Sequence, residues 1–264
     1  MPTANTIAVT TAQMQQLEGW MFAAGLPIAA LMEKVVQRLT ARLIDLYPLA
    51  THPRVGVWVG SGHNGGDALG VARELYHRGY LVQIIAPVDR LKPLTQDHLN
   101  YAKAIGIPIF QSTDLEQLQQ QWQILAPQMH WWIDGLFGFG LERPITGHLA
   151  AAIDWLNHHP APVVSLDLPS GLHSDRGEPL GIAVKATHTL CLGLWKRGLW
   201  QETSLPYLGN ATCIDLDFPP QALALLASEP PPPCSLSWDA VQPGLSLDLP
   251  VNAHKYQRGH VLRS

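Results

Sequence analysis

The sequence is poor in cysteine and in charge. Only three cysteines, Cys191, Cys213 and Cys234, occur in 264 residues, and they show neither CxxC nor metal-ligand spacing. This excludes a disulfide framework and predicts buried thiols in a reducing compartment. Charged residues make up 14% of the chain, the net charge is -4, and no lysine- and arginine-rich run occurs. The chain therefore lacks the basic field that attracts nucleic acid, and we expect no such partner.

Long apolar segments are missing as well. No apolar run reaches the roughly 18 residues that a membrane span requires. The opening residues, MPTANTIAVTTAQMQQLEG, have neither the basic start nor the apolar core of a secretory leader. We therefore expect a cytoplasmic protein without a membrane partner. With 47% hydrophobic residues, the chain can bury one full core, which predicts one main domain.

The apolar periodicity predicts an α/β fold. The first fifty residues are typical of two helices, and after Pro53 short apolar runs alternate with longer amphipathic stretches, as in βα units. The expected strands cover residues 55–59, 81–86, 108–110, 130–133, 163–166, 187–192 and 211–214, and the expected helices 67–78, 94–105, 114–126 and 148–157. Strands that alternate with helices are mostly parallel. We predict a three-layer αβα, doubly wound, Rossmann-like sheet preceded by two helices.

A proline-rich segment marks the predicted end of this domain. Pro219, Pro220 and residues 230–233 cannot donate backbone hydrogen bonds, and they favour an extended spacer. We therefore assign residues 1–218 to the main domain and residues 219–264 to a linker with a short tail.

A glycine-rich turn follows the first strand of the alternating region, in VGVWVGSGHNGGDALGVARELYHRG. Gly60, Gly62 and Gly65 satisfy G-x-G-x-x-G, a dinucleotide-binding pattern that is weak by itself and that a plain tight turn also explains. Asp67 would repel a pyrophosphate at the helix start. The next strand ends in Pro87 instead of an acidic residue that could hold a ribose. The turn is therefore adapted to another ligand.

Several groups in this turn can contact such a ligand. Asn64 offers an amide oxygen, and Gly65 and Gly66 allow close backbone approach. His63 could contact a substrate or act as an acid or base, but a solvated loop histidine is the more common role.

Two later strands end in a carboxylate. Asp134 in HWWIDGLFGFGLERPITG precedes a glycine-rich loop, and Asp167 in APVVSLDLPSGLHSDRGE precedes Ser170. Ligands of open α/β sheets bind at the carboxyl ends of the strands, although an Asp can also simply cap a turn. Two carboxylates in one pocket repel each other unless a cation or a proton intervenes. The oxygen-only ligand set favours a hard cation over zinc.

Together, GSGHNGGDALG, DGLFGFGLERP and SLDLPSG resemble the NAD(P)H-hydrate epimerase family, the YjeF amino-terminal type, over about residues 10–217. The early LEG…GLPIAALMEKV is also similar. The resemblance implies an isomerase that interconverts the R and S epimers of hydrated NADH and NADPH, with a potassium ion as cofactor. It implies potassium ligands at Asn64, Asp134 and Ser170. It implies substrate contacts at His63, Asn64, Gly65, Gly66, Asp67, Gly138, Phe139, Gly140, Leu141, Glu142, Arg143, Pro144 and Asp167. The family usually has a second Asn where this chain has His63.

Asp134 is our candidate for the acid/base residue, because a carboxyl at this position could transfer a proton to the hydroxyl of the hydrate. Two alternatives remain open: a Rossmann-type NAD-dependent oxidoreductase and a non-catalytic nucleotide-binding module. A homodimer is also left open. The tail sequence HKYQRGHVL resembles the opening of the ADP-dependent NAD(P)H-hydrate dehydratase domain. Because the sequence stops soon afterwards, we expect that domain to be truncated and expect no ATP or ADP binding.

Overall fold

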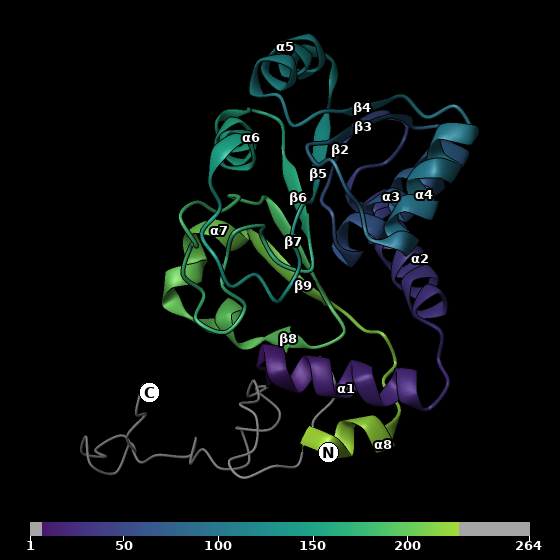
Figure 1. Cartoon of the computed structure of the whole chain (residues 1–264), viewed down its shortest axis with the longest axis vertical. Coiled ribbons are helices and arrows are strands. Elements are labelled where there is room, and N and C mark those ends of the chain that lie inside the picture. The colour runs from purple at the N-terminus through teal and green to yellow at the C-terminus, as the bar shows by residue number, and fades with distance from the viewer. Residues whose placement is uncertain (1–6, 227–264) are drawn as a thin grey trace, which may run out of the picture.

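The computed structural model describes residues 7–226 and is built around a seven-stranded parallel sheet (Figure 1). The strand order is β4-β3-β2-β5-β6-β7-β9, and every neighbouring pair is parallel. These strands are β2 (Arg54–Val59), β3 (Leu81–Ala86), β4 (Ile109–Gln111), β5 (Trp131–Gly135), β6 (Val163–Leu166), β7 (His188–Leu192) and β9 (Asn210–Ile214). The predicted parallel, Rossmann-like α/β fold is confirmed.

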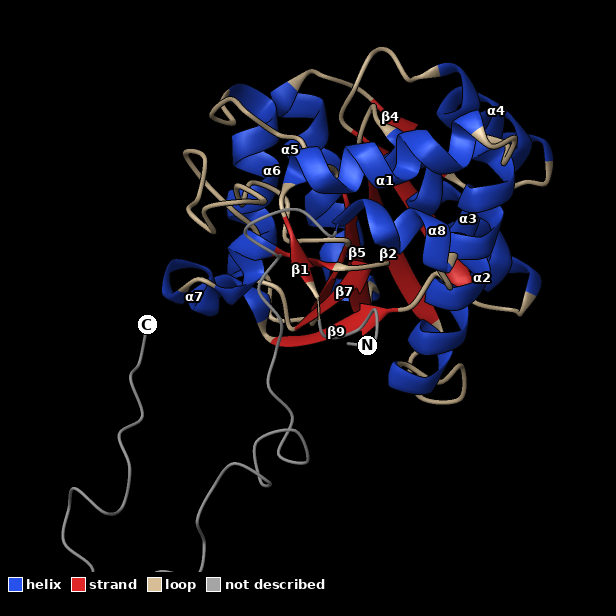
Figure 2. Ribbon diagram, turned by 90° about the horizontal axis from the view of Figure 1, so that it is seen from below, coloured by secondary structure: helices blue, strands red, loops and turns tan. Residues whose placement is uncertain are grey.

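Helices cover both faces of the sheet. The longer ones are α1 (Thr11–Ala23), α2 (Ile28–Leu46), α3 (His63–His77), α4 (Pro93–Ala104), α5 (Leu115–Leu125) and α6 (Gly147–His158). Shorter turns are η2 (Ala126–Gln128), η3 (Arg197–Trp200), η4 (Glu202–Ser204), α7 (Leu205–Leu208), α8 (Pro220–Leu223) and η5 (Ala224–Leu226). Helices α2, α3 and α4 lie on one face and α5 and α6 on the other (Figure 1). Helix α1 crosses one end of the sheet (Figure 2).

A hydrophobic core lies on each face of the sheet, because successive side chains of a strand point to opposite faces. In β2, Val57 and Val59 pack into the core beneath α2 and α3, whereas Trp58 packs into the core beneath α5 and α6. In β5, Trp131 and Trp132 divide between the two cores in the same way. Both faces of the sheet are therefore buried, which explains why the strands are nearly continuous apolar runs in the sequence.

The strand order fixes where a ligand can bind. The chain builds β2, β3 and β4 outward in one direction and then returns to place β5 on the other side of β2. The connections after β2 and β5 leave on opposite faces, which opens a crevice at the carboxyl ends of these two strands. The glycine-rich turn and Asp134 lie at that crevice.

Helix α1 is tied to the opposite half of the chain. Its preceding strand β1 (Ala8–Val9) pairs with β8 (Trp195–Lys196) in a small parallel sheet that the periodicity did not predict. Thr10 caps α1 in a reciprocal capping box with Gln13. The backbone N–H of Thr11 donates to Asp175 Oδ1 at 2.7 Å, and the hydroxyls of Thr11 and Ser174 lie 2.5 Å apart. The start of α1 is therefore anchored beside the turn that follows Ser170.

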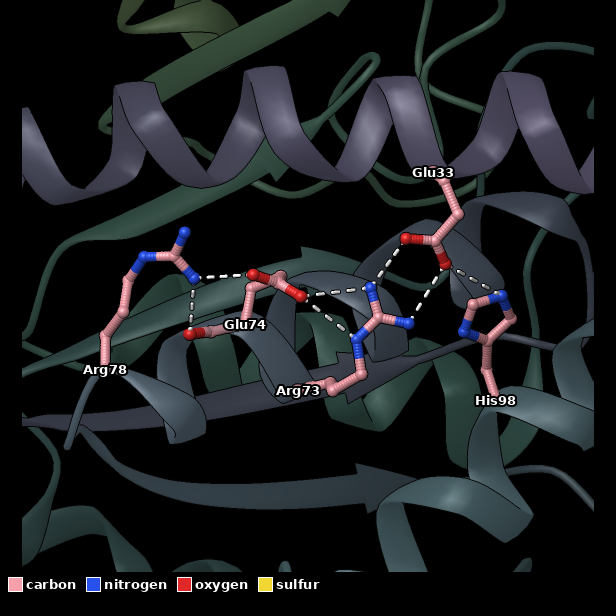
Figure 3. Close-up of polar contacts among 5 residues, drawn as sticks. All are labelled: Glu33, Arg73, Glu74, Arg78 and His98. Atoms are coloured by element: carbon pink, nitrogen blue, oxygen red, sulfur yellow. Dashed lines mark hydrogen bonds and ion pairs between the residues drawn. The ribbon is translucent and has the colours of Figure 1, made fainter.

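An ion-pair network joins three helices on one side of the sheet (Figure 3). Arg73 of α3 contacts both carboxylate oxygens of Glu33 in α2, at 3.0 and 2.7 Å, and also contacts Glu74. Arg78 contacts Glu74 at 2.6 Å, and His98 of α4 lies 4.0 Å from Glu33. The bidentate Arg73–Glu33 pair fixes α2 against α3 more firmly than a single contact would.

Three predictions at the boundaries of elements need correction. Helix α3 begins at His63, not at residue 67, because the glycine turn itself is helical. Strand β5 extends through Asp134, which therefore lies within the sheet. The main domain does not end at residue 218, because Ala222 and Leu226 are buried in the same core as Phe218. The proline run 230–233 and HKYQRGHVL lie outside the described residues.

Within residues 7–226, no single helix is long and apolar enough to cross a membrane. Helices α1 and α2 meet that criterion only together, as a pair bent by 119°. Cys191 and Cys213 have free thiols, and Cys234 lies outside the described residues.

Candidate active site

A cavity of about 400 Å³ opens at the carboxyl ends of the central strands. One wall comes from α1 and α2, a second from the start of α3, and a third from the loop that follows β5. Asp167 and Lys196 contribute to the remaining wall. The predicted crevice is thus a pocket, and α1 forms part of its wall.

Close packing of backbone shapes the glycine turn. A Cβ atom at Gly65 would lie 2.0 Å from the carbonyl oxygen of Gly60, and one at Gly60 would lie 1.7 Å from that of Leu136. The Thr95 hydroxyl donates to the Gly62 carbonyl at 2.9 Å, which holds the turn from the side of α4. Only glycine at residues 60 and 65 therefore lets the turn approach the strand end so closely.

Asn64 lies in the first turn of α3, lines the cavity and is 8% exposed. Neither its amide oxygen nor its amide nitrogen has a hydrogen-bond partner in the protein, although both atoms are buried. Leaving buried polar atoms without partners costs free energy, so such groups usually have a ligand that completes their contacts. Asn64 is therefore the clearest sign of a polar ligand in this pocket.

The Asp134 carboxylate is completely buried and engaged by the protein. Its Oδ1 accepts hydrogen bonds from the Ser170 hydroxyl at 2.5 Å and the Leu136 N–H at 3.2 Å. Its Oδ2 accepts from the Ser165 hydroxyl at 2.7 Å and the Ser170 N–H at 2.9 Å. Burial raises the pKa of Asp134 in spite of these donors. Asp134 is not among the residues that line the cavity, so the structure places it behind the wall rather than against a substrate.

Asp167 does face the cavity. It adopts a left-handed conformation with φ of 68°, which turns the chain sharply after β6. Its Oδ2 accepts the Phe139 N–H at 3.0 Å and its Oδ1 contacts the Lys196 ammonium at 2.5 Å. Burial opposes the charge on Lys196, but the attraction of Asp167 outweighs it and raises the pKa of Lys196. The pair therefore forms a buried, charged wall of the pocket.

Two further carboxyl groups line the same cavity. Asp67 of α3 is 8% exposed, and burial together with repulsion from Asp167 and Glu18 raises its pKa well above the usual range. Glu18 of α1 is half-buried, and burial raises its pKa to about 7, since the repulsion from Asp167 and the attraction of Lys196 act in opposite directions. Sequence reasoning missed Glu18 and Lys196. Neither residue belongs to the motifs from which the site was predicted.

The loop after β5 only partly reaches the cavity. Gly138, Phe139, Gly140 and Leu141 line it, and a Cβ at Gly138 would lie 3.3 Å from both Asn64 Cβ and Asp167 Oδ2. The remaining predicted contacts of this loop, Glu142, Arg143 and Pro144, are exposed and do not line the cavity. Glu142 instead lies 3.7 Å from the buried His173 ring.

His63, at the start of α3, lines the cavity, whereas Gly65 and Gly66 are buried in the turn behind it. Burial and the nearby Lys92 lower the pKa of His63, which favours the neutral imidazole. Residues 7–226 contain no cluster of three His, Cys, Asp or Glu residues suited to a metal ion. The predicted cation ligands Asn64, Asp134 and Ser170 are of a different type, because they combine an amide, a carboxylate and a hydroxyl.

The chain is similar to several known proteins. The sequence profile described as YjeF-related protein N-terminus matches residues 28–198. A bifunctional NAD(P)H-hydrate repair enzyme Nnr from Synechocystis sp. is 49% identical over 254 residues, covering 96% of this chain and 47% of the relative. An NAD(P)H-hydrate epimerase from Oenococcus oeni is 34% identical over 195 residues, covering 73% of this chain and 87% of that enzyme.

The crystal structure of the yeast protein ynu0 has the same fold, with a TM-score of 0.67 at 19% identity over 78% of this chain and 86% of the yeast chain. The chain spans about half the length of the bifunctional relatives, with 47% and 48% of two of them covered.

Proposed function

Since the chain belongs to the family of YjeF-related protein N-termini, we propose that it is an epimerase of hydrated NADH and NADPH. The reaction would interconvert the R and S forms in the repair of nicotinamide cofactors. The observation that carries this proposal is the cavity at the sheet's crevice, which is lined by both the unpartnered Asn64 amide and the buried Asp167–Lys196 pair. The names of its relatives, an NAD(P)H-hydrate repair enzyme and an NAD(P)H-hydrate epimerase, support the same activity.

The substrate chemistry fits the charged groups of the cavity. The hydrate carries its hydroxyl on a carbon bonded to the ring nitrogen, so protonation of that hydroxyl lets water leave as the nitrogen lone pair forms a double bond. Addition of water to the other face inverts the carbon. Each step needs an acid or base within hydrogen-bond reach of the hydroxyl or of the water.

We assign acid/base work to Asp167 and not to Asp134. The hydrogen bonds from Leu136, Ser165 and Ser170 occupy both Asp134 oxygens away from the cavity, whereas Asp167 lines it. Lys196 and the Phe139 N–H hold the Asp167 carboxylate in a fixed orientation. Asp134 then orients the Ser170 hydroxyl and contributes negative charge beneath the cavity floor.

We propose that a potassium ion binds at Asn64. The buried amide oxygen of Asn64 lines the cavity and has no protein partner, so it is free to bind a cation. Asp134 and Ser170 are hydrogen-bonded to each other and neither lines the cavity, so Asp134 would contribute its charge from behind the wall. When bound, potassium would supply positive charge that offsets the carboxylates and helps to orient the substrate. We further propose that His63, Asn64, Asp67 and the 138–141 backbone contact the substrate, with Glu142, Arg143 and Pro144 at the rim.

A coupled assay tests the function. Purified R epimer is supplied with an S-specific dehydratase, and conversion of R is followed against a blank without this protein. Enzyme-dependent conversion supports the proposal. Binding of the hydrate without conversion would indicate a non-catalytic module, and hydride transfer from intact NADH to a second substrate would indicate an oxidoreductase.

A further inference from the structure

Helix α1 presents one face to the cavity. Met14, Gln15, Glu18 and Phe22 line the pocket from successive turns of this helix. The helix crosses this end of the sheet (Figure 2), and the cavity is lined both by α1 and by Asp167 from the strand ends. The anchoring of Thr11 to Ser174 and Asp175 keeps α1 in this position.

Glu18 is the only acidic or basic residue on α1. Within the described residues, no hydrogen bond or ion pair reaches its carboxyl group, so the group is available to a ligand. Burial raises its pKa to about 7. The charged or titratable groups that act on it or share its cavity are Lys196 of β8, Asp167 after β6, Asp67 and His63 of α3, and Lys92 before α4.

Inversion of a carbon that loses and regains water requires proton transfer on both faces of the ring. A single carboxylate on the sheet side can serve only one face, because the ring itself lies between it and the other face. Glu18 and Asp167 line the same cavity from different elements, α1 and the turn after β6. We propose that Glu18 is a catalytic residue that serves the ring face opposite Asp167. This inference rests on the proposed epimerase function.

The inversion proceeds through two proton transfers, one on each face of the ring. Glu18 donates its proton to the hydroxyl, the C–O bond breaks, water leaves on the α1 side, and the ring nitrogen lone pair forms the C=N bond. A water molecule on the sheet side then adds to the carbon and transfers its proton to Asp167. Glu18 then regains a proton from solvent and Asp167 releases its proton to solvent, so the net result is inversion with no oxidation or reduction. The reverse reaction uses the two carboxyl groups in the opposite roles.

The test compares Glu18→Gln with wild type and with Glu116→Gln, which makes the same chemical change at an exposed position on α5. We expect Glu18→Gln to lower kcat by about 10² or more while KM stays within severalfold. The inflection near pH 7 should disappear from the pH profile of the residual activity. Glu18→Asp, which keeps a titratable group, should retain an intermediate rate, and Glu116→Gln should match wild type.

Oxygen exchange separates catalysis from a structural effect. In isotopically labelled water, Glu18→Gln should still exchange the hydroxyl oxygen of one epimer, because Asp167 can remove and return water on its own face, while inversion is lost. Inversion within severalfold of wild type, or equal loss of exchange in both epimers, overturns the inference. If wild-type protein itself does not convert R to S above the blank, the proposed function fails instead.

Discussion

The ammonium nitrogen of Lys196 lies 2.5 Å from Asp167 Oδ1 and 2.6 Å from the carbonyl oxygen of Leu192, and the Lys196 side chain has no solvent exposure. A lysine is seldom buried without a partner, because removing its charge from water costs several kcal/mol. Asp167 is held in a left-handed backbone conformation to meet it. The two charges therefore depend on each other for their place in the pocket wall.

Removing one of these charges should destabilise the fold. Lys196→Met leaves the Asp167 carboxylate buried without its cation, and we expect a loss of about 3–5 kcal/mol in the free energy of unfolding. The double variant Asp167→Asn/Lys196→Met should recover much of this loss. Urea denaturation measures both, with the exposed Lys103→Met as control. A single-variant loss no larger than that of Lys103→Met would show that the pair does not act as a buried unit.

Glu18 should make stability depend on pH. Its pKa rises from 4.5 to about 7 on folding, so the folded state holds the proton to higher pH than the unfolded chain does. The stability that this proton supplies is complete below pH 4.5 and is lost as pH rises towards 7. The melting temperature of Glu18→Gln minus that of wild type should therefore increase from pH 5 to pH 8. Glu116→Gln should show no such trend, and a flat difference for Glu18→Gln would contradict the raised pKa.

Asp134→Asn and Asp167→Asn should differ in how turnover responds to potassium. At residue 134, an amide group would face donors from Leu136, Ser165 and Ser170, so we expect a loss of about 1–3 kcal/mol in stability and weaker cation binding. At residue 167, the buried Lys196 loses its anion, so stability should fall as well, and turnover of the folded protein should fall by about 10² or more at any potassium concentration. Single-turnover epimerisation across a potassium titration distinguishes them. Rescue of Asp167→Asn by high potassium would argue against its acid/base role.

Epimerase activity should depend on a potassium ion bound at Asn64. Exchange of potassium for a bulky organic cation should lower substrate affinity or turnover in wild type, because the buried amide oxygen of Asn64 would lose its ligand. Asn64→Leu should show little further response to potassium. Activity is measured in potassium-free buffer to which the ion is added back. Equal rates with and without potassium would remove the cation from the proposal.

The glycine turn offers a matched pair of substitutions. Gly65→Ala places a Cβ 2.0 Å from the Gly60 carbonyl oxygen, within rigid backbone, and we expect a loss of about 1–3 kcal/mol or more in stability together with a distorted cavity. A Cβ at Gly62 meets nothing within 4 Å, so Gly62→Ala should cost about 1 kcal/mol or less, as expected at a helix N-cap. Thermal unfolding compares the two, and similar losses would show that the turn can relax.

The sequence predicted the sheet well because each strand carries its own local pattern. Strands β3 and β6 have the expected bounds, and the other predicted strands differ by one or two residues at an end. The small sheet of β1 and β8 was missed, because two-residue strands have no period to detect. The start of α3 was placed late, because glycines normally indicate a turn and here tertiary packing makes them helical.

The site was predictable where the motifs lie in sequence and unpredictable where distant segments meet. Asn64 and Asp167 were identified from their position after strands, and both line the cavity. The burial of Asp134 depends on Ser165 and Ser170 from the neighbouring strand and turn, which a linear reading does not reveal. Glu18 lies in the site because hydrogen bonds of Thr11 with Ser174 and Asp175, which are distant in sequence, hold α1 in place.

The position of α1 across the strand ends also affects the order in which the protein folds during synthesis. Glu18 of α1 shares a cavity with Lys196 of β8, which is far away in sequence, and the central strand β2 acquires its neighbour β5 only after β3 and β4 have been made. Such non-local contacts form late in folding, since a long loop must close before they yield any stabilisation. A nascent chain on the ribosome can therefore build much of the sheet while the pocket is still incomplete. The onset of ligand binding would thus report the completion of folding.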